Sequence, residues 1–479
     1  MARGLSVEKW EQYLYDKLGN PTANAVVYQA KGKTIARVWD ENHERWKRLK
    51  QARINEMDAN AILNAIDSLT SNRVWKERII LKGNFIIDQT LLLPSYCIFD
   101  AYQAKFKLED NTNAPLIKAE NAQHLEILGV KSDGNATNQN PPAGLHHIRI
   151  WNSKNFKIAD IFIENAPEWC LELKLCDHAY LENLHFYTTG FATDGLGIID
   201  CNNITAKGVF GRTGDDLVSI HAKERGVWDI QIENINGISE NAALLGIYHE
   251  SNDTNTVYPI KRIVVRGMTG YTLNSEATGH LIKIGSKISD AVFEDITIED
   301  FEGSAGEGIR LALNYEGYAP CTIRRLTLKG KIYDTTLGPA IYLTDYGTLE
   351  KSEINVIAEH VRKDHTAFWF NGIVNHTKIK GYMENESGSV GQGVYLRQGS
   401  YNLISVRVKY ANQAVILGET DCAVTRTKVT NCIIESTNYA PIEERGDSDY
   451  NVIAENIIPS GTSIATVGTN TVTRNNDAL

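Results

Sequence analysis

Three aspartates are the residues of this sequence whose type and spacing could do chemistry. Asp194 stands in Ala192-Thr-Asp, while Asp215 and Asp216 are adjacent in Thr213-Gly-Asp-Asp, 21 positions after Asp194. Carboxylates packed within a few ångströms raise one another's pKa, so that one keeps its proton near neutral pH while another stays charged. A proton donor and a carboxylate placed side by side are what cleavage of a glycosidic bond requires.

The surrounding sequence explains how residues so far apart would meet. From about Arg78 onward, short strand-like runs recur with a period of roughly 21 to 33 residues, the range typical of solenoids. Examples are Leu196-Gly-Ile-Ile199, Leu217-Val-Ser-Ile220 and Leu244-Leu-Gly-Ile247. One unit is too short to enclose a core, so each predicts one coil of a parallel β-helix with alternate residues pointing inward. The three aspartates are then expected on one outer face in adjacent coils.

The competing all-β interpretations are a propeller and a β-sandwich. Hairpin signals of the Asn-Gly type are few in this sequence, and the length of the repeated unit varies as the loops of solenoids do. The pattern therefore favours an all-β fold of the parallel β-helix class.

The N-terminal part of the chain has a different character. Val7 to Leu18 and Val38 to Leu69 are charged, contain tryptophan and have spacing compatible with helices. We therefore expect residues 1–57 to form a helical attachment or oligomerisation element. The β-helix is expected over residues 58–479, with a capping helix near residues 58–69 that closes the open end of the strand stack.

Composition limits the partners and the cofactors. Lys plus Arg total 49 against 59 for Asp plus Glu, a net charge of −10, so nucleic acid is not an expected partner. No apolar run is long enough to span a bilayer, and no secretory signal follows Met1, so no membrane partner is expected. The cellular location stays open, and virion-associated or extracellular placement by another route is compatible. The seven cysteines form no CxxC pair and are predicted to be buried free thiols, and no metal or other cofactor is predicted.

Several motifs carry a family resemblance. They include Ser132-Asp-Gly-Asn135, Thr193-Asp-Gly195 and Thr213-Gly-Asp-Asp-Leu-Val-Ser-Ile220. Residues 58–475 resemble the pectin-lyase-like superfamily of right-handed parallel β-helices, and residues 129–300 resemble glycoside hydrolase family 28, the polygalacturonases. The resemblance implies an inverting mechanism in which Asp215 is the general acid, while Asp194 and Asp216 hold and deprotonate the water.

The sequence departs from the family pattern at three places. Ala192 stands where the family has the asparagine of Asn-Thr-Asp, and Asn241-Ala-Ala243 replaces its Gly-His-Gly, leaving His249 as a loose substitute. The Arg-Ile-Lys motif reads Leu281-Ile-Lys283, so Lys283 is retained and the arginine is not. A lysine offers a point charge where arginine would grip a uronate carboxylate with two bonds. We therefore predict cleavage of a polysaccharide without pectin specificity.

Aromatic residues supply further predicted contacts with the substrate. Trp169 and Tyr248 are expected near the carboxylate face, where their rings could stack on sugar rings. Two alternatives stay open at this stage. One is a glycan-binding viral or cell-surface spike without catalysis, similar to virus tailspikes and compatible with a homotrimer. The other is a calcium-dependent polysaccharide lyase, since aligned carboxylates can also hold Ca²⁺.

Overall fold

The structure is a computed structural model that describes residues 23–40, 45–53, 58–140, 144–190, 192–251, 253, 256–273, 279–312 and 319–478. The chain divides into two units. The first comprises Met1–Gly197 with Cys201–Gly211, and the second comprises Ile198–Asp200 with Arg212–Leu479. The division falls within the strands β14 (Leu196–Ile199) and β15 (Asn202–Thr213).

The first unit is built almost entirely of short strands. Its other elements are β1 (Ala25–Ala30), β2 (Lys33–Asp40), β3 (Arg45–Arg53), α2 (Asp58–Asp67), β4 (Glu77–Ile87), β5 (Leu91–Leu92), β6 (Cys97–Leu108), β7 (Ile117–Glu120), β8 (Glu126–Leu128), β9 (Lys131–Asp133), the 3-10 helix η1 (Ala136–Asn138), β10 (Ile148–Trp151), β11 (Lys154–Glu164), β12 (Leu171–Lys174) and β13 (Asp177–Tyr187).

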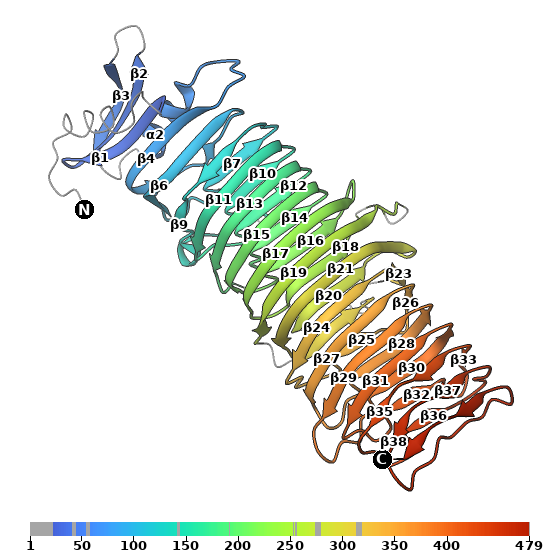
Figure 1. The fold of residues 1–479 in the computed structure, drawn as a ribbon. Coiled ribbons are helices and arrows are strands. Elements are labelled where there is room, and N and C mark those ends of the chain that lie inside the picture. The colour runs from blue at the N-terminus through green and yellow to red at the C-terminus, as the bar shows by residue number, and fades with distance from the viewer. Residues whose placement is uncertain are drawn as a thin grey trace. The chain divides into compact units, whose positions relative to one another are not determined.

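Apart from the antiparallel strands near its N-terminus, this unit consists of three ladders of parallel strands (Figure 1). Ladder 1 contains β5, β7, β10 and β12. The long strands β6 and β11 supply the other two ladders, because their first halves pair with β8 and their second halves with β9. Each coil therefore contributes a rung to every ladder, which is the arrangement of a parallel β-helix.

The second unit repeats the same plan. Its elements are β16 (Val218–Ala222), β17 (Val227–Ser239), β18 (Ala243–His249), β19 (Ile260–Thr272), β20 (His280–Ser286), β21 (Ala291–Ser304), β22 (Glu307–Leu311), β23 (Cys321–Arg324), β24 (Thr327–Tyr333), β25 (Ile341–Leu343), β26 (Gly347–Glu350), β27 (Glu353–Val361), β28 (Phe368–Asn375), β29 (Lys378–Asn385), β30 (Val394–Ser400), β31 (Leu403–Lys409), β32 (Val415–Leu417), β33 (Val424–Thr425), β34 (Lys428–Thr430), β35 (Ile433–Ile434), β36 (Ile442–Glu444), β37 (Val452–Ala454), β38 (Ile457–Ile458), β39 (Val472–Arg474) and β40 (Asp477–Ala478).

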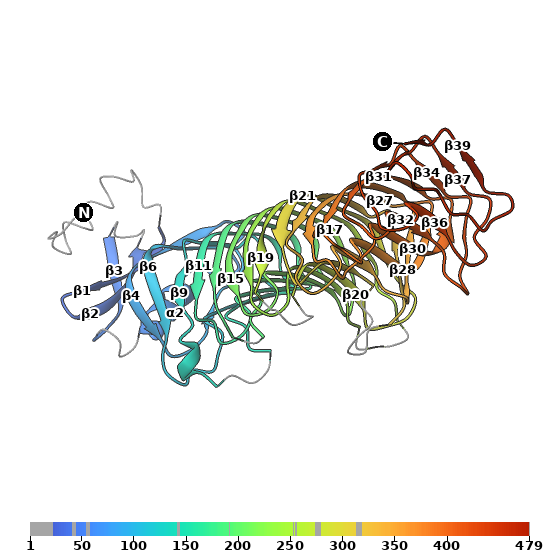
Figure 2. The same ribbon diagram turned by 90° about the horizontal axis from the view of Figure 1, so that it is seen from below.

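Ladder 1 of the second unit is the one that carries the candidate site. It consists of β16, β18, β20, β22, β25, β28, β30, β32 and β36, paired in that order and all parallel. Figure 2 shows β20, β28 and β30 on one side of this unit and β21, β27 and β31 on the other. The prediction of a parallel β-helix is confirmed.

Alternation along the strands separates the core from the outer faces. In β28, Phe368 and Phe370 are fully buried, whereas Trp369 between them is half-buried on the outer side. Successive side chains of a strand point to opposite faces, and the parallel register aligns equivalent positions of neighbouring coils. Residues of different coils are thereby brought into straight rows on the outer face.

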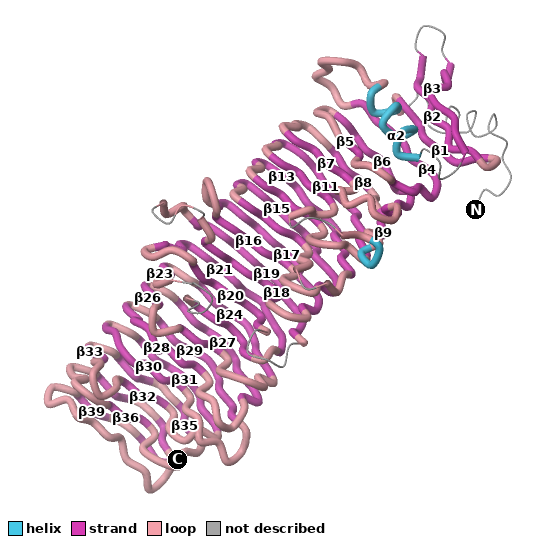
Figure 3. Tube along the Cα trace, turned by 180° about the vertical axis from the view of Figure 1, so that it is seen from behind, coloured by secondary structure: helices cyan, strands magenta, loops and turns pink. Residues whose placement is uncertain are grey.

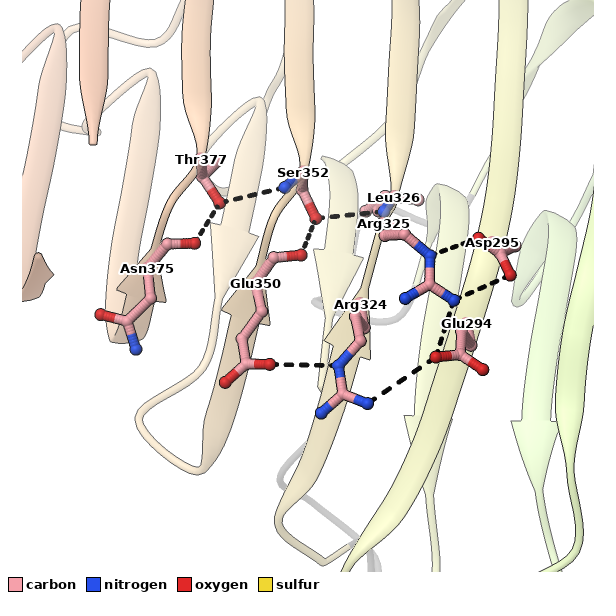
Figure 4. A network of polar contacts seen from close by, with 9 residues as sticks. All are labelled: Glu294, Asp295, Arg324, Arg325, Leu326, Glu350, Ser352, Asn375 and Thr377. Atoms are coloured by element: carbon pink, nitrogen blue, oxygen red, sulfur yellow. Dashed lines mark hydrogen bonds and ion pairs between the residues drawn. The ribbon is translucent and has the colours of Figure 1, made fainter. Parts of the chain in front are cut away.

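Polar side chains at the turns tie neighbouring coils together (Figure 4). The amide N–H of Leu326 donates to Oγ of Ser352 at 3.1 Å, and the amide N–H of Ser352 donates to Oγ1 of Thr377 at 3.4 Å. Beside this stack, Nε of Arg324 lies 3.2 Å from Oε2 of Glu350 in the next coil. Buried donors of the backbone are satisfied in this way where the ladders are interrupted.

Among the described N-terminal residues, the predicted helices agree with the structure only at α2. A helix, α2, is present where the capping helix was predicted, and it buries Ala59, Ile62 and Ile66 and packs beside β4 (Figure 3). Its capping role stays a prediction. The helix predicted from Val38 onward is wrong before residue 54, because β2 and β3 form an antiparallel hairpin there.

The tryptophans of that hairpin account for the difference. Trp39 lies opposite Trp46, with ring centroids 5.4 Å apart. Such cross-strand aromatic contacts stabilise a hairpin and override helical spacing. The helix predicted over residues 7–18 lies outside the described residues, and the attachment role of residues 1–57 stays a prediction.

Two composition-based predictions can be compared with the structure. All seven cysteines are free and all but Cys422 are buried, so the prediction of free thiols is confirmed. Within the described part of the chain, the helices are too short or too polar to cross a bilayer.

Candidate active site

Asp215 and Asp216 lie in the tight turn between β15 and β16, at the start of a ladder 1 rung. The next coil holds the backbone of this turn. Oγ of Ser239 donates to the carbonyl oxygen of Asp215 at 2.9 Å, and Nδ2 of Asn241 donates to the carbonyl oxygen of Gly214 at 2.7 Å. The two carboxylates are thus carried by a backbone that neighbouring side chains fix in place.

The Asp216 carboxylate is buried, with 4% of the residue exposed, and each of its oxygens accepts a hydrogen bond. Oδ1 accepts from the amide N–H of Ala243 at 2.8 Å, and Oδ2 accepts from the hydroxyl of Tyr248 at 2.8 Å. Burial raises the pKa of Asp216, while the ammonium group of Lys283 and the two donors oppose that rise. Both donors favour the charged form of Asp216.

Asp215 is only partly buried, and its side chain has a different role from that of Asp216. Burial and the adjacent Asp216 carboxylate raise the pKa of Asp215 to about 7, against the opposing effect of Lys283. Two like charges this close titrate as a pair, so near neutral pH one proton is shared between them. The two donors to Asp216 favour placing that proton on Asp215.

Lys283 lies in β20, where the register places it opposite Gly246 of β18. The residue is 6% exposed, yet its charge lowers the pKa of both aspartates. Gly246 is required between them: a Cβ there would lie 2.5 Å from Oδ2 of Asp216 and 2.3 Å from Cε2 of Tyr248. The structure therefore brings together four of the predicted site residues, Asp215, Asp216, Tyr248 and Lys283.

His249 was predicted as a substitute for the missing family histidine, and its contacts lie elsewhere. Its Nε2 accepts a hydrogen bond from the amide N–H of Tyr258 at 2.8 Å, and burial lowers its pKa. His249 follows Tyr248 in β18, so strand alternation directs the two side chains to opposite faces. Its role as a substrate contact stays a prediction that these contacts do not support.

A charged cluster beside Tyr248 was missed by the sequence analysis. Oε2 of Glu250 lies 3.1 Å from Nδ1 of His221 and 3.3 Å from Nζ of Lys223, while Oε1 lies 2.9 Å from Nζ of Lys287. Burial raises the pKa of Glu250, but the hydrogen bond with His221 and the ammonium groups of Lys223 and Lys287 outweigh it and lower the pKa overall. The Glu250 charge in turn raises the pKa of Asp215.

The sequence contained one signal for this cluster. His221 pairs in register with Tyr248, and their ring centroids are 5.2 Å apart. His221 therefore occupies an outward position of the strand that follows Gly-Asp-Asp, and alternation counted from Ile220 would have indicated this. No comparable pattern marks Glu250, which contacts His221 only because the chain returns after one coil.

Asp194 and Trp169 belong to the first unit. Asp194 lies two residues before β14 and is 3% exposed, and its carbonyl oxygen accepts from the amide N–H of Cys170 at 2.8 Å. Trp169 stacks on His146 with centroids 4.7 Å apart, and Nε2 of His146 lies 3.5 Å from Oε1 of Glu172. The placement of Asp194 and Trp169 beside Asp215 and Asp216 stays a prediction.

One protein family matches the region that contains these residues. Residues 121–323 match glycosyl hydrolases family 28. The matched segment includes Asp194, Asp215, Asp216 and Lys283, and it confirms the resemblance seen in the motifs. No curated protein matches the chain in sequence.

Solved structures similar to this chain include a virus tailspike, an endo-xylogalacturonan hydrolase and a family 28 exopolygalacturonase. The tailspike protein of E. coli bacteriophage HK620, in complex with a pentasaccharide, has a TM-score of 0.55 at 11% identity, with 97% of this chain and 86% of that chain covered. The endo-xylogalacturonan hydrolase from Aspergillus tubingensis has a TM-score of 0.48 at 14% identity, with 74% and 96% covered. The family 28 exopolygalacturonase of Yersinia enterocolitica has a TM-score of 0.46 at 12% identity, with 79% and 83% covered. At these identities the likeness concerns the fold.

Proposed function

We propose that this protein is a glycoside hydrolase that cleaves a polysaccharide with Asp215 as the general acid. The observation that carries the proposal is the unequal environment of the adjacent aspartates. Asp216 accepts hydrogen bonds from two donors that favour its charged form, and Asp215 has its pKa raised to about 7. The family 28 match over residues 121–323 supports the same chemistry.

In the proposed reaction, Asp215 donates its proton to the glycosidic oxygen as the bond to the sugar breaks. Asp216 orients a water molecule and removes its proton as the water attacks the anomeric carbon from the opposite face. This course inverts the anomeric configuration, and it needs roughly 6.5–9.5 Å between the acid and the base to leave room for the water. Proton NMR of the first product formed distinguishes inversion from retention.

Lys283 is the proposed substrate contact nearest to the acid. Its buried ammonium group already stabilises negative charge on both aspartates, so it keeps the pair from taking up two protons. Leu281, where the family pattern has an arginine, is fully buried and offers no charge. Specificity for galacturonate is therefore not part of the proposal.

The test is the release of reducing ends from a panel of acidic and neutral polysaccharides. Wild-type protein is compared with Asp215→Asn, which keeps the shape of the side chain but cannot donate a proton. Asp290→Asn, at an exposed turn after β20, serves as the matched control. We expect cleavage by the wild type and the control and none by Asp215→Asn. Equal activity of Asp215→Asn and wild type would reject the assignment, and unsaturated products absorbing in the ultraviolet would indicate a lyase.

A glycan-binding spike is the second candidate function. The fold likeness to the HK620 tailspike, at a TM-score of 0.55, favours it. The two functions are compatible, because a spike can also cleave the glycan that it binds. Light scattering that finds a trimer, together with glycan binding and no product in the same panel, would favour the spike over the hydrolase.

A further inference from the structure

A straight row of outward-facing side chains continues from Lys283 along ladder 1 of the second unit. The parallel register aligns one residue of each successive strand, and inward neighbours such as Ile309, Ile341 and Phe368 are fully buried. The row consists of Gly246, Lys283, Arg310, Tyr342, Trp369 and Tyr395.

The aromatic members of this row form a continuous half-buried surface. The centroids of Tyr342 and Trp369 are 5.2 Å apart, and those of Trp369 and Tyr395 are 6.4 Å apart. The guanidinium of Arg310 lies 5.1 Å from the centroid of Tyr342. Strand spacing of about 4.8 Å gives a distance of about 19 Å from Lys283 to Tyr395, comparable to the length of several sugar residues.

The charges beside the row are already neutralised. Nη1 of Arg310 lies 3.0 Å from Oε2 of Glu307, and Nε of Arg397, two residues after Tyr395, lies 2.8 Å from Oε2 of Glu419. A polyanion would have to compete with these carboxylates for the arginines. Aromatic rings, in contrast, present faces that pack against the apolar C–H faces of uncharged sugars.

We propose that Tyr342, Trp369 and Tyr395 form a binding track for an uncharged stretch of polysaccharide that extends from the cleavage point. The proposal rests on the proposed function, because Lys283 joins the row to the Asp215 and Asp216 pair. It adds the substrate class, a neutral chain long enough to reach several coils beyond the acid. Short oligosaccharides that end near Lys283 would not reach the aromatic rings, so these rings would not increase their binding affinity.

The test is affinity electrophoresis in gels that contain galactomannan, xyloglucan, dextran or polygalacturonate, with Asp215→Asn as the non-cleaving background. Trp369→Ala removes the central ring, and Tyr395→Ala removes the last ring as an independent variant. Tyr382→Ala is the matched control, since Tyr382 is also a half-buried strand residue but belongs to β29, outside ladder 1. Circular dichroism verifies folding of each variant.

We expect at least one neutral polysaccharide to retard the background protein. Both track variants should weaken that binding about ten-fold, in keeping with the loss of one aromatic contact, whereas Tyr382→Ala should not. Retardation by no neutral polysaccharide, or by polygalacturonate alone, would overturn the proposal, as would unchanged binding by both track variants.

The failures of the track and of the hydrolase can be told apart. Cleavage by the wild type with unchanged binding in Trp369→Ala and Tyr395→Ala would reject the binding track and support the proposed hydrolase activity. Binding to a neutral polysaccharide that depends on Trp369, with no cleavage by the wild type, would reject the proposed hydrolase activity and support the binding track.

Discussion

Replacing Asp215 with asparagine should change how the stability of the protein depends on pH. The pKa of Asp215 is raised from 3.8 to about 7, so the folded protein holds this proton more tightly than the unfolded chain does. A carboxyl group with a raised pKa weakens the fold when it ionises. Its stabilising protonated state is complete below about pH 4 and is lost as the pH rises through about 7.

The expected magnitude follows from the size of the shift. A shift of about 3 pKa units, at about 1.4 kcal/mol per unit, gives about 4 kcal/mol, and partial exposure of Asp215 together with its coupling to Asp216 reduces this to about 2–4 kcal/mol. Asparagine cannot ionise, so Asp215→Asn should match the wild type at about pH 4 and exceed its free energy of unfolding by that amount at about pH 8.

The assay is urea-induced unfolding at a series of pH values, followed by intrinsic fluorescence. Asp290→Asn is the control, because this exposed carboxylate is hydrated in both the folded and the unfolded chain and its replacement should leave the pH dependence of the wild type unchanged. Parallel stability curves for wild type and Asp215→Asn across this pH range would refute the reasoning that burial and Asp216 hold a proton on Asp215.

Three further substitutions test the surroundings of the pair. Tyr248→Phe removes the donor to Oδ2 of Asp216 and should lower kcat about 10- to 100-fold, as measured by reducing-end release, with little change in far-ultraviolet circular dichroism. Gly246→Ala places a methyl group 2.5 Å from the same oxygen and should lower kcat at least about 10-fold while costing about 1–3 kcal/mol in urea unfolding. Lys283→Met removes the charge that lowers the pKa of Asp215, so the alkaline limb of the rate profile should move up by about one pH unit. An unmoved limb would show that Lys283 does not act on the acid.

The repeated coils, and the position of Gly-Asp-Asp at the start of one of them, could be predicted because both depend on short-range pattern, whereas the catalytic role of these aspartates stays a prediction. Alternation of apolar residues indicates which side chains face outward. Lys283 was found through the family's Arg-Ile-Lys pattern, and the register of the structure places it opposite Gly246. The family motif added the identity of Asp215 and Asp216. These features require no knowledge of how loops fold over the ladder.

The remaining features depend on contacts between distant segments. The β2–β3 hairpin contains Trp39 and Trp46 with a spacing that also fits a helix, and their packing across the hairpin decides between the two. Glu250 acquires its partners only when three segments of the chain meet. His249 was predicted as a loose substitute for the histidine of the family's Gly-His-Gly motif, although it follows Tyr248 in β18 and adjacent strand residues point to opposite faces.

The most direct test of the central claim is the pH dependence of kcat/KM for polysaccharide hydrolysis. A general acid must be protonated, so a pKa of about 7 for Asp215 predicts that wild-type activity falls as the pH rises through about 7, and that Asp215→Asn shows no activity at any pH. Activity in Asp215→Asn equal to that of the wild type, or a wild-type profile that stays flat through this region, would contradict the claim.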